Sequence, residues 1–283
     1  MSKIQNKMLE SQVITNLESD SETDFLSASV GKLLDTKKLD TQLKSYTLII
    51  DDTNGNDSTA NGTLSKPFKT IKAAYDYLPD FVNTVNLKIK DGTYDEGSTI
   101  QLYKNIINLN ISSYDENSTV IISAEQSNTR DSLIYISNSH KVTIDNISFT
   151  RNKNLSSGNC ITIDCTSFDI TNCNFEDSYI AIKTSCSNGQ IDNCKFDNLY
   201  CAINANKASN ILSTNNESIQ DVQYGIICNG SIVINYGENL IGTTDDYITT
   251  LYGRVFMTET EVAVASIINN SGEITSIGNT DTE

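Results

Sequence analysis

Basic residues are scarce in this sequence. Its 283 residues include 20 Lys and Arg against 36 Asp and Glu, which gives a formal net charge of -16. Nucleic acids and anionic membrane surfaces are bound by clustered Lys and Arg side chains. The charge balance therefore excludes both as expected partners. An excess of acidic residues is typical of an exposed, elongated protein, because the negative charge keeps such a protein soluble.

A long hydrophobic run is also missing. Residues 1–17 contain no apolar core of the kind that a signal peptide requires, and the longest aliphatic run nearby is Leu48–Ile50. A membrane span would need about 20 consecutive apolar residues. We therefore expect a protein that is made in a cytoplasm, has no signal peptide and does not insert into a membrane.

Cysteine is confined to one part of the chain. All seven cysteines lie between Cys160 and Cys228, and none forms a Cys-x-x-Cys motif. A secreted disulfide scaffold is short and has an even number of cysteines, and a structural zinc site needs closely spaced ligands. We therefore predict free, buried thiols, and neither a metal nor another cofactor.

Residues that favour strands and turns are abundant by contrast. Ile, Thr, Asn, Asp and Ser recur throughout, and hydrophobic residues make up 38% of the chain. β-Branched side chains favour strands, whereas Asn, Asp and Ser favour tight turns. The composition predicts an all-β protein, and the length allows one extended domain with a short additional segment.

Residues 1–45 differ in character from the rest. A polar break at Ser19–Asp24 precedes a predicted helix from about Leu26 to Lys44, in which apolar residues follow short runs of 4,3 spacing. Such a helix is too short to be stable alone in water. We therefore expect its apolar stripe to be buried against sister chains, as in a homotrimer, or against a larger body.

Residues 46–246 are predicted to form the main domain. Near its start, Phe68, Ile71, Tyr75 and Leu78 are spaced 3, 4 and 3 residues apart, with a proline on each side. This spacing places the four side chains on one face of a helix. We predict a capping helix over residues 68–78, followed by strands.

Three segments of this domain align residue for residue: Ile144–Phe149, Ile170–Phe175 and Ile191–Phe196. They begin 26 and 21 residues apart, and short Ile-containing strand segments precede them at similar intervals. Such spacing is typical of solenoids. The fixed leucines of leucine-rich repeats and the 3.6-residue period of helical repeats are both missing, so we predict a parallel β-helix.

The alignment stacks equivalent residues of successive coils in columns about 4.8 Å apart. An asparagine at a tight bend can adopt the left-handed conformation, and its amide can bond to the asparagine of the next coil. Apolar residues of the same repeat should point inward. The predicted ladder consists of Asn146, Asn172 and Asn193, continued by Asn215 and Asn235, beside inward columns of Phe149, Phe175 and Phe196 and of Ile147, Cys173 and Cys194.

Residues 247–283 change in character again, because scattered apolar residues are followed by a polar tail. The end of a β-helix exposes backbone groups that would otherwise recruit another chain. We predict that this segment forms a small β cap with a frayed tail from Gly278.

Residues Asp51–Glu96 resemble the opening of pectin lyase-like β-helix proteins. The resemblance lies in Gly55-Asn-Asp57, Gly62-Thr63, the helix start Pro67–Ile71, and Gly92-Thr-Tyr94. It implies a right-handed, single-stranded parallel β-helix with three faces, whose amino-terminal end is closed by the predicted helix.

Residues Val13–Leu17 and Leu26–Leu34 resemble a short module that is common in phage tail fibres, appendages and baseplate-associated proteins. In that module a Leu-Ser-Ala segment leads into Gly-Lys, then Leu or Val, then Leu and a helix. This sequence departs from it at Val30, where glutamine is usual. The resemblance implies a virion protein that is attached to other virion structural proteins through residues 1–45.

The pectin lyase-like fold also includes polysaccharide lyases and glycoside hydrolases, so catalysis needs a test. The chain has a single histidine, His140, in a polar turn, and it lacks the Gly-His-Gly and Arg-Ile-Lys motifs of the polygalacturonase-like branch. Asp145 and Asp192 are expected on one face, two coils apart, where they could act as acid and base. The alternative is a solvated acidic face, and we assign no catalytic residue.

The loop Asp52–Asp57 has alternating oxygen ligands but lacks the glycine position and the bidentate glutamate of a calcium loop. We predict an Asx-turn loop there.

Three functions remain open from the sequence. The first is a phage fibre or appendage protein that recognises a host-surface glycan and contributes to adsorption. The second is a depolymerase that cleaves such a polymer, and the third is a structural spacer or capsid decoration without a ligand. Candidate sugar-binding side chains are Tyr103, Tyr114, Tyr135, Tyr179 and Tyr200.

Overall fold

The computed structural model describes residues 13–14, 25–26, 44–124, 131–151, 158–236, 245–250, 252–257, 267–268 and 272–276. The chain divides into two compact units, Met1–Lys44 and Ser45–Glu283. In the first unit, β1 (Val13–Ile14) pairs in parallel with β2 (Phe25–Leu26). Leu26, the predicted start of a helix, therefore lies in a strand. The rest of that helix, residues 27–43, lies outside the described residues.

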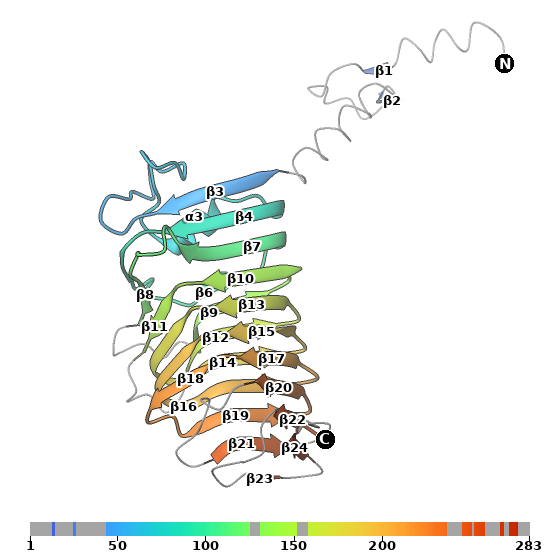
Figure 1. Ribbon diagram of the computed structural model, residues 1–283. Helices are drawn as coiled ribbons and strands as arrows, with labels where there is room; N and C mark the ends of the chain where they lie inside the picture. The colour runs from blue at the N-terminus through green and yellow to red at the C-terminus, as the bar shows by residue number, and fades with distance from the viewer. Residues whose placement is uncertain are drawn as a thin grey trace, which may run out of the picture. The chain divides into compact units, whose positions relative to one another are not determined.

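The second unit is a parallel β-helix, as the repeats predict, with about seven turns (Figure 1). One face is a ten-stranded parallel sheet. Its strands, in spatial order, are β3 (Ser45–Ile50), β4 (Phe81–Ile89), β7 (Asn105–Ser113), β10 (Lys141–Asp145), β13 (Ser167–Thr171), β15 (Asn188–Asp192), β17 (Asn210–Thr214), β20 (Ile232–Tyr236), β22 (Arg254–Met257) and β24 (Glu273–Ser276).

The other two faces share one branched sheet, because β14 (Asn174–Ser185) and β16 (Lys195–Asn206) are long enough to contribute to both. The first parts of these two strands stack with β5 (Gly92–Tyr94), β8 (Val120–Ser123), β11 (Ser148–Thr150) and β18 (Glu217–Gln220). Their second parts stack with β6 (Ile100–Leu102), β9 (Ser132–Ser137), β12 (Asn159–Asp164), β19 (Tyr224–Asn229), β21 (Asp245–Thr250) and β23 (Ile267–Ile268).

The described strands of residues 247–283, the segment predicted as a β cap, continue the existing sheets. β22 pairs in parallel with β20, and β24 pairs in parallel with β22. The coil therefore extends at least to Ser276. The predicted frayed tail, residues 278–283, lies outside the described residues.

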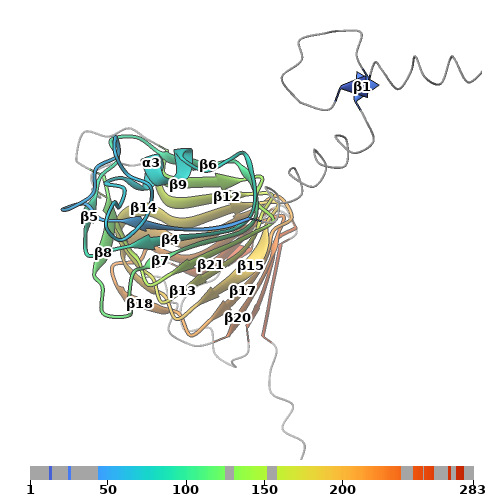
Figure 2. The ribbon, with the colours of Figure 1, turned by 90° about the horizontal axis from the view of Figure 1, so that it is seen from above.

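A helix and a loop cover the first coil (Figure 2). The helix α3 (Ile71–Asp76) packs against β3, β4 and β6 and buries Ile71, Ala74 and Tyr75. The outer edge of β3 is paired with the loop that follows this strand, since Phe68 donates its amide to the Ile49 carbonyl at 2.9 Å. An exposed strand edge would invite pairing with another chain, and this loop blocks it.

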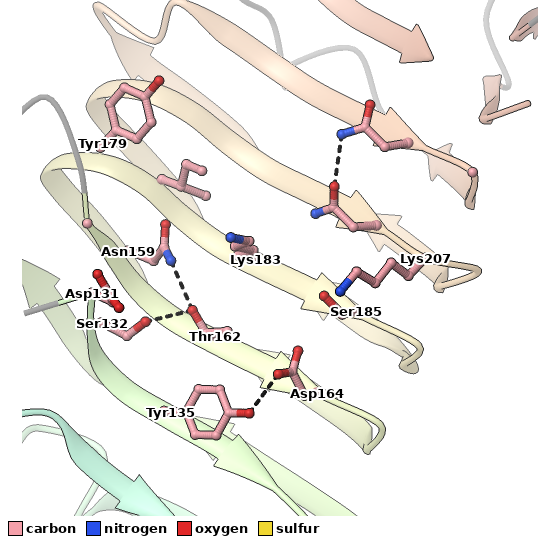
Figure 3. A pocket seen from close by; sticks show the side chains of 15 residues that line it. Asp131, Ser132, Tyr135, Asn159, Thr162, Asp164, Tyr179, Lys183, Ser185 and Lys207 are labelled. Atoms are coloured by element: carbon pink, nitrogen blue, oxygen red, sulfur yellow. Dashed lines mark hydrogen bonds between the residues drawn. The ribbon is translucent and has the colours of Figure 1, made fainter. Parts of the chain in front are cut away.

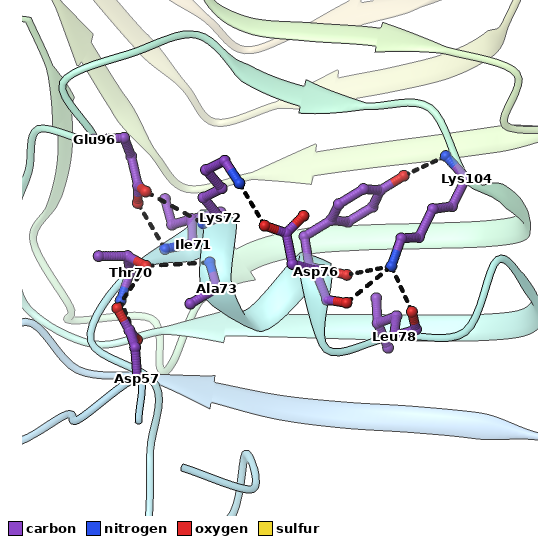
Figure 4. Close-up of polar contacts among 10 residues, drawn as sticks. Asp57, Thr70, Ile71, Lys72, Ala73, Asp76, Leu78, Glu96 and Lys104 are labelled. Atoms are coloured by element: carbon purple, nitrogen blue, oxygen red, sulfur yellow. Dashed lines mark hydrogen bonds and ion pairs between the residues drawn. The ribbon is translucent and has the colours of Figure 1, made fainter. Parts of the chain in front are cut away.

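The helix is shorter than the predicted range 68–78, and side chains at both of its ends explain the difference (Figure 4). Thr70, the N-cap, accepts a hydrogen bond from Ala73, and Glu96 accepts one from the Ile71 amide at 2.6 Å. At the other end, the Lys104 ammonium donates to the carbonyls of Tyr75 and Asp76, at 3.1 and 3.0 Å, and to that of Leu78. These groups satisfy backbone atoms that a helix leaves unpaired, so a helix of only six residues is stable here.

Inward-facing residues form continuous columns in the core. Phe149, Phe175 and Phe196 are paired in register and almost fully buried, and their rings stack with centroids 5.1 and 5.3 Å apart. The predicted phenylalanine column is therefore present. Beside it lies the predicted column of Ile147, Cys173 and Cys194, all buried, in which the two thiols donate to backbone carbonyls.

One inward column places a large side chain next to a glycine. The Phe168 ring is buried opposite Gly189, its partner in the next strand. A methyl group at Gly189 would lie 2.3 Å from the Phe168 carbonyl oxygen and 2.6 Å from the ring. Only a glycine leaves room for the ring at this place in the coil.

Four of the five predicted ladder asparagines lie at equivalent turns of successive coils. Asn146, Asn172, Asn193 and Asn215 have φ values of 54°, 54°, 52° and 53°, the left-handed conformation that was predicted. Asn193 donates its side-chain amide to Asn172 at 2.7 Å, whereas Asn172 donates to Asp145 at 2.7 Å. The side chains at these turns therefore form a row in which asparagine amides bond to carboxylates as well as to another asparagine.

Asn235 does not continue the ladder. It lies inside β20, paired with Ser213, and its side chain is 2% exposed. The Ser213 hydroxyl donates to the Asn235 side-chain oxygen at 2.6 Å. The prediction was wrong because the register places Asn235 before the turn, where its side chain points inward.

The prediction that all thiols are buried was wrong for two of the seven. Every cysteine is a free thiol; Cys160, Cys173, Cys194, Cys201 and Cys228 are buried, whereas Cys165 and Cys186 are exposed. The exposed pair has φ values of 50° and 51°. The left-handed turn directs these side chains away from the core.

Among the described residues, no helix has the length and apolar character to cross a membrane.

Candidate functional site

The two carboxylates considered as an acid and base pair, Asp145 and Asp192, lie in one column as expected. Thr171 is the strand partner of both and separates them. Its hydroxyl donates to Asp145 at 2.7 Å, and the Thr214 hydroxyl donates to Asp192 at 2.5 Å. These bonds tie both carboxylates to the next coil. Because Thr171 lies between the two carboxylates and both are hydrogen-bonded to the next coil, the arrangement supports a structural role for Asp145 and Asp192 beside the asparagine turns.

The predicted tyrosines divide between different surfaces. Tyr179 and Tyr200 stack on adjacent coils with ring centroids 4.2 Å apart and an interplanar angle of 10°. Tyr224, which was not predicted, meets the Tyr200 ring edge-on at 5.0 Å and extends the row. Burial, the adjacent Tyr179 and further neighbours raise the pKa of Tyr200 to about 12, so its hydroxyl is protonated at neutral pH.

A groove with a volume of about 1040 Å³ runs beside the start of this row (Figure 3). It crosses the face formed by β9, β12, β14, β16 and β19. The residues that line it are Asp131, Ser132, Tyr135, Gly158, Asn159, Thr162, Asp164, Tyr179, Ile180, Lys183, Ser185, Asn206, Lys207, Asn229 and Gly230.

The register explains why polar groups meet in the groove. Alternate residues of each strand point outward, and parallel pairing stacks them across the coils. One outward column contains Tyr135, Thr162 and Lys183, and the next contains Asp164 and Ser185. Ile136, Ile163 and Thr184 occupy the inward positions between these columns in successive coils, and all three are buried, so the floor of the groove packs on the core.

Hydrogen bonds hold several of these side chains in place. The Tyr135 hydroxyl donates to Asp164 at 2.7 Å, and this bond raises the pKa of Tyr135, as burial also does. Asn159 donates to the Thr162 hydroxyl oxygen at 3.0 Å, and the Thr162 and Ser132 hydroxyls are 2.6 Å apart. The side chains are therefore ordered before any ligand arrives.

The far end of the groove is lined by amides and cations. Asn229 donates its side-chain amide to Asn206 at 2.8 Å. Lys183 and Lys207 contribute ammonium groups, and within the described ranges neither forms an ion pair with a carboxylate. This end of the groove therefore offers positive charge and hydrogen-bond donors, in a chain whose net charge is -16.

A second, smaller hollow of about 520 Å³ lies at the turns of the ladder. Tyr114, Asp145 and Asn146 are among the residues that line it. The Lys90 ammonium lies 5.6 Å from the centroid of the Tyr114 ring. Tyr103 is 55% exposed and lines neither of these cavities.

The remaining predicted features carry no site. His140 is exposed, and its backbone amide donates to Ile106. The loop after β3 contains the predicted Asx turn, since Asp51 accepts hydrogen bonds from the amides of Thr53 and Asn54 at 3.1 and 2.9 Å. Among the residues that the structure describes, no group of three or more His, Cys, Asp or Glu side chains is placed to hold a metal ion.

Sequence reasoning identified Tyr135 and Tyr179 but missed most of the groove. Asn159, Lys183, Asn206 and Lys207 carry no motif that distinguishes them from other polar surface residues. The available signal was the alternation of inward and outward residues along these strands, which places Tyr135, Thr162 and Lys183 on one face once the register is known.

Comparison with protein-family models, curated proteins and solved structures yields no match for this chain.

Proposed function

We propose that this chain is a fibre or appendage protein of a phage virion, and that the groove of its solenoid binds a host-surface glycan. The observation that carries the binding proposal is the groove itself. Hydroxyl, amide, carboxylate and ammonium groups line it, and the tyrosine row begins beside it.

This combination suits a carbohydrate. Sugar hydroxyls both donate and accept hydrogen bonds, while the C–H faces of a sugar ring are apolar and pack against aromatic rings. The five strands that cross the groove span about 19 Å at a spacing of about 4.8 Å per coil. An extended oligosaccharide fits that length better than a single sugar does.

The virion proposal is supported by the module-like sequence of residues 1–45 and by the separation of Met1–Lys44 from the solenoid as a compact unit. We propose that residues 1–45 bind other virion structural proteins and assemble the chain as a homotrimer. Light scattering of the full chain should give the mass of three copies. A truncated chain without residues 1–45 that remains trimeric would show that this segment does not drive assembly.

The binding test uses the full chain on an array of purified bacterial capsular polysaccharides and teichoic acids, followed by titration calorimetry of any polymer that is retained. Replacing Lys183 with Ala or Tyr179 with Ala should weaken binding at least about tenfold, a loss of about 1.4 kcal/mol. Tyr236→Ala is the matched control, because Tyr236 is 45% exposed on the ten-stranded sheet. Equal affinity of all these proteins would place the binding elsewhere.

Adsorption gives a second readout. Purified protein should bind host cells and reduce phage adsorption, and failure in both assays would refute receptor binding. Two carboxylates, Asp131 and Asp164, line the groove, so cleavage is tested in the same samples. New reducing ends or unsaturated sugars would identify a depolymerase in place of a protein that only binds.

A further inference from the structure

Two exposed thiols, Cys165 and Cys186, lie on adjacent coils next to the groove. The pairing of β12 with β14 places Asp164 opposite Ser185, and the two cysteines follow directly after these partners. Both cysteines adopt the left-handed conformation. The Cys165 amide also donates to the Ser185 carbonyl at 2.9 Å, which continues the strand pairing into the turn. The two side chains therefore leave equivalent positions of neighbouring coils.

The spacing of these residues suits a disulfide bond. Neighbouring strands lie about 4.8 Å apart, and disulfides join residues whose Cα atoms are about 4.4–6.8 Å apart. The two side chains are also close enough to influence each other, because desolvation and the nearby Cys186 thiol raise the pKa of Cys165. The backbone spacing of the two residues therefore permits a bond between their sulfur atoms.

The other five cysteines are buried, so Cys165 and Cys186 are the pair that a reagent can reach. Burial raises the pKa values of Cys160 and Cys201 to about 12 and that of Cys228 to about 11. A thiol reacts as its thiolate, and it must also be reached by the reagent. Buried thiols of high pKa meet neither condition, whereas both members of the pair are exposed.

We propose that Cys165 and Cys186 form a dithiol modification site, which a low-molecular-weight disulfide converts into a disulfide bond between adjacent coils. One cysteine, as its thiolate, attacks a sulfur of the small disulfide, whose other half leaves as a thiol. The second cysteine then attacks the protein sulfur of the mixed disulfide and expels the remaining half as a second thiol. The two cysteines lose two electrons and two protons, and the small disulfide gains them.

The bond would link two turns beside the groove. It closes the loop of chain from residue 165 to residue 186, and such a constraint restricts the unfolded chain. The oxidised protein should therefore unfold at a higher urea concentration than the reduced protein. The adjacent Asp164 and Ser185 line the groove, so the same bond would restrain one of its walls.

The test treats the full chain with oxidised glutathione and follows intact mass and peptide mapping. The expected product has lost two hydrogen atoms, contains one peptide that joins Cys165 to Cys186, and returns to its original mass and urea midpoint with dithiothreitol. Cys165→Ser and Cys186→Ser should each stop at one bound glutathione. The double variant should retain its mass and midpoint.

Two results would overturn the proposal. One is wild-type protein that accumulates with glutathione on both cysteines and no cross-link, which would show that the sulfur atoms cannot meet. The other is a disulfide between two chains, which would show that the thiols face a partner copy. Glycan binding is not needed for either measurement, so the outcome is independent of the proposed function.

Discussion

The phenylalanine column makes a quantitative prediction about what holds the coils together. Phe175 is 1% exposed, and its ring stacks on Phe149 on one side and on Phe196 on the other. Replacing a buried phenylalanine with alanine costs about 3–5 kcal/mol through lost burial and the cavity left behind. Each stacked ring pair adds about 0.5–1.5 kcal/mol. Phe175→Ala should therefore lower the free energy of unfolding by at least about 4 kcal/mol.

The assay is urea unfolding followed by circular dichroism, with the slope of the transition measured for each protein. Tyr236→Ala is the control, since removal of an exposed aromatic side chain should change the free energy by no more than about 0.5 kcal/mol. Phe149→Ala tests the stacking directly, because the double variant with Phe175→Ala should show a coupling of about 0.5–1.5 kcal/mol. A loss below about 1 kcal/mol for Phe175→Ala would refute the packing argument.

Three further predictions concern the core and the capping helix. Gly189→Ala would place a methyl group 2.3 Å from the Phe168 carbonyl, so it should lower the thermal midpoint as overpacking does, at a cost of about 1–3 kcal/mol; an unchanged midpoint would contradict the close contact. Lys104→Met removes the donor to the last carbonyls of α3 and should cost about 1.5–3 kcal/mol in urea unfolding, whereas an unaltered midpoint would mean that water replaces the ammonium. Burial raises the pKa of the Glu96 carboxyl above its usual value of 4.5. Between these two pKa values the folded protein binds more protons than the unfolded chain. The contribution of Glu96 to the free energy of unfolding therefore falls as pH rises from 4.5 through the folded pKa. The Glu96→Gln protein should lack this pH dependence, so the difference in unfolding free energy between the two proteins should change across this pH window. Parallel pH profiles of the two proteins would show that Glu96 does not titrate there.

The columns were predictable because the coil repeats. Once Phe149, Phe175 and Phe196 are aligned, the 4.8 Å stacking of parallel strands and the alternation of side chains place all three in the core. The same alignment predicted Asn146, Asn172 and Asn193 at left-handed turns. The alignment was unreliable where the repeat weakens, and the register of β20 placed Asn235 inside the coil.

The groove and the helix caps were not predictable in the same way. Lys104 reaches α3 from a turn more than 25 residues further along the chain, and nothing in its local sequence distinguishes it from other lysines. Lys183 and Lys207 meet in one groove because of the coil register. Contacts of this kind depend on which coils are neighbours, which a local pattern does not encode.

The sequence by itself determined the architecture, because β-branched residues at alternating positions and a repeat of 21 to 26 residues can bury their apolar faces only by stacking coil on coil. The tertiary structure decided which surface residues lie together. The left-handed turns direct Cys165 and Cys186 outward side by side, although 20 residues separate them in the chain. Strand pairing brings Tyr135, Asp164 and Lys183 to one face, where the groove forms. The physical reason is that the alternation of side chains along a strand decides which residues are buried in a coil. The register between coils decides which exposed residues become neighbours.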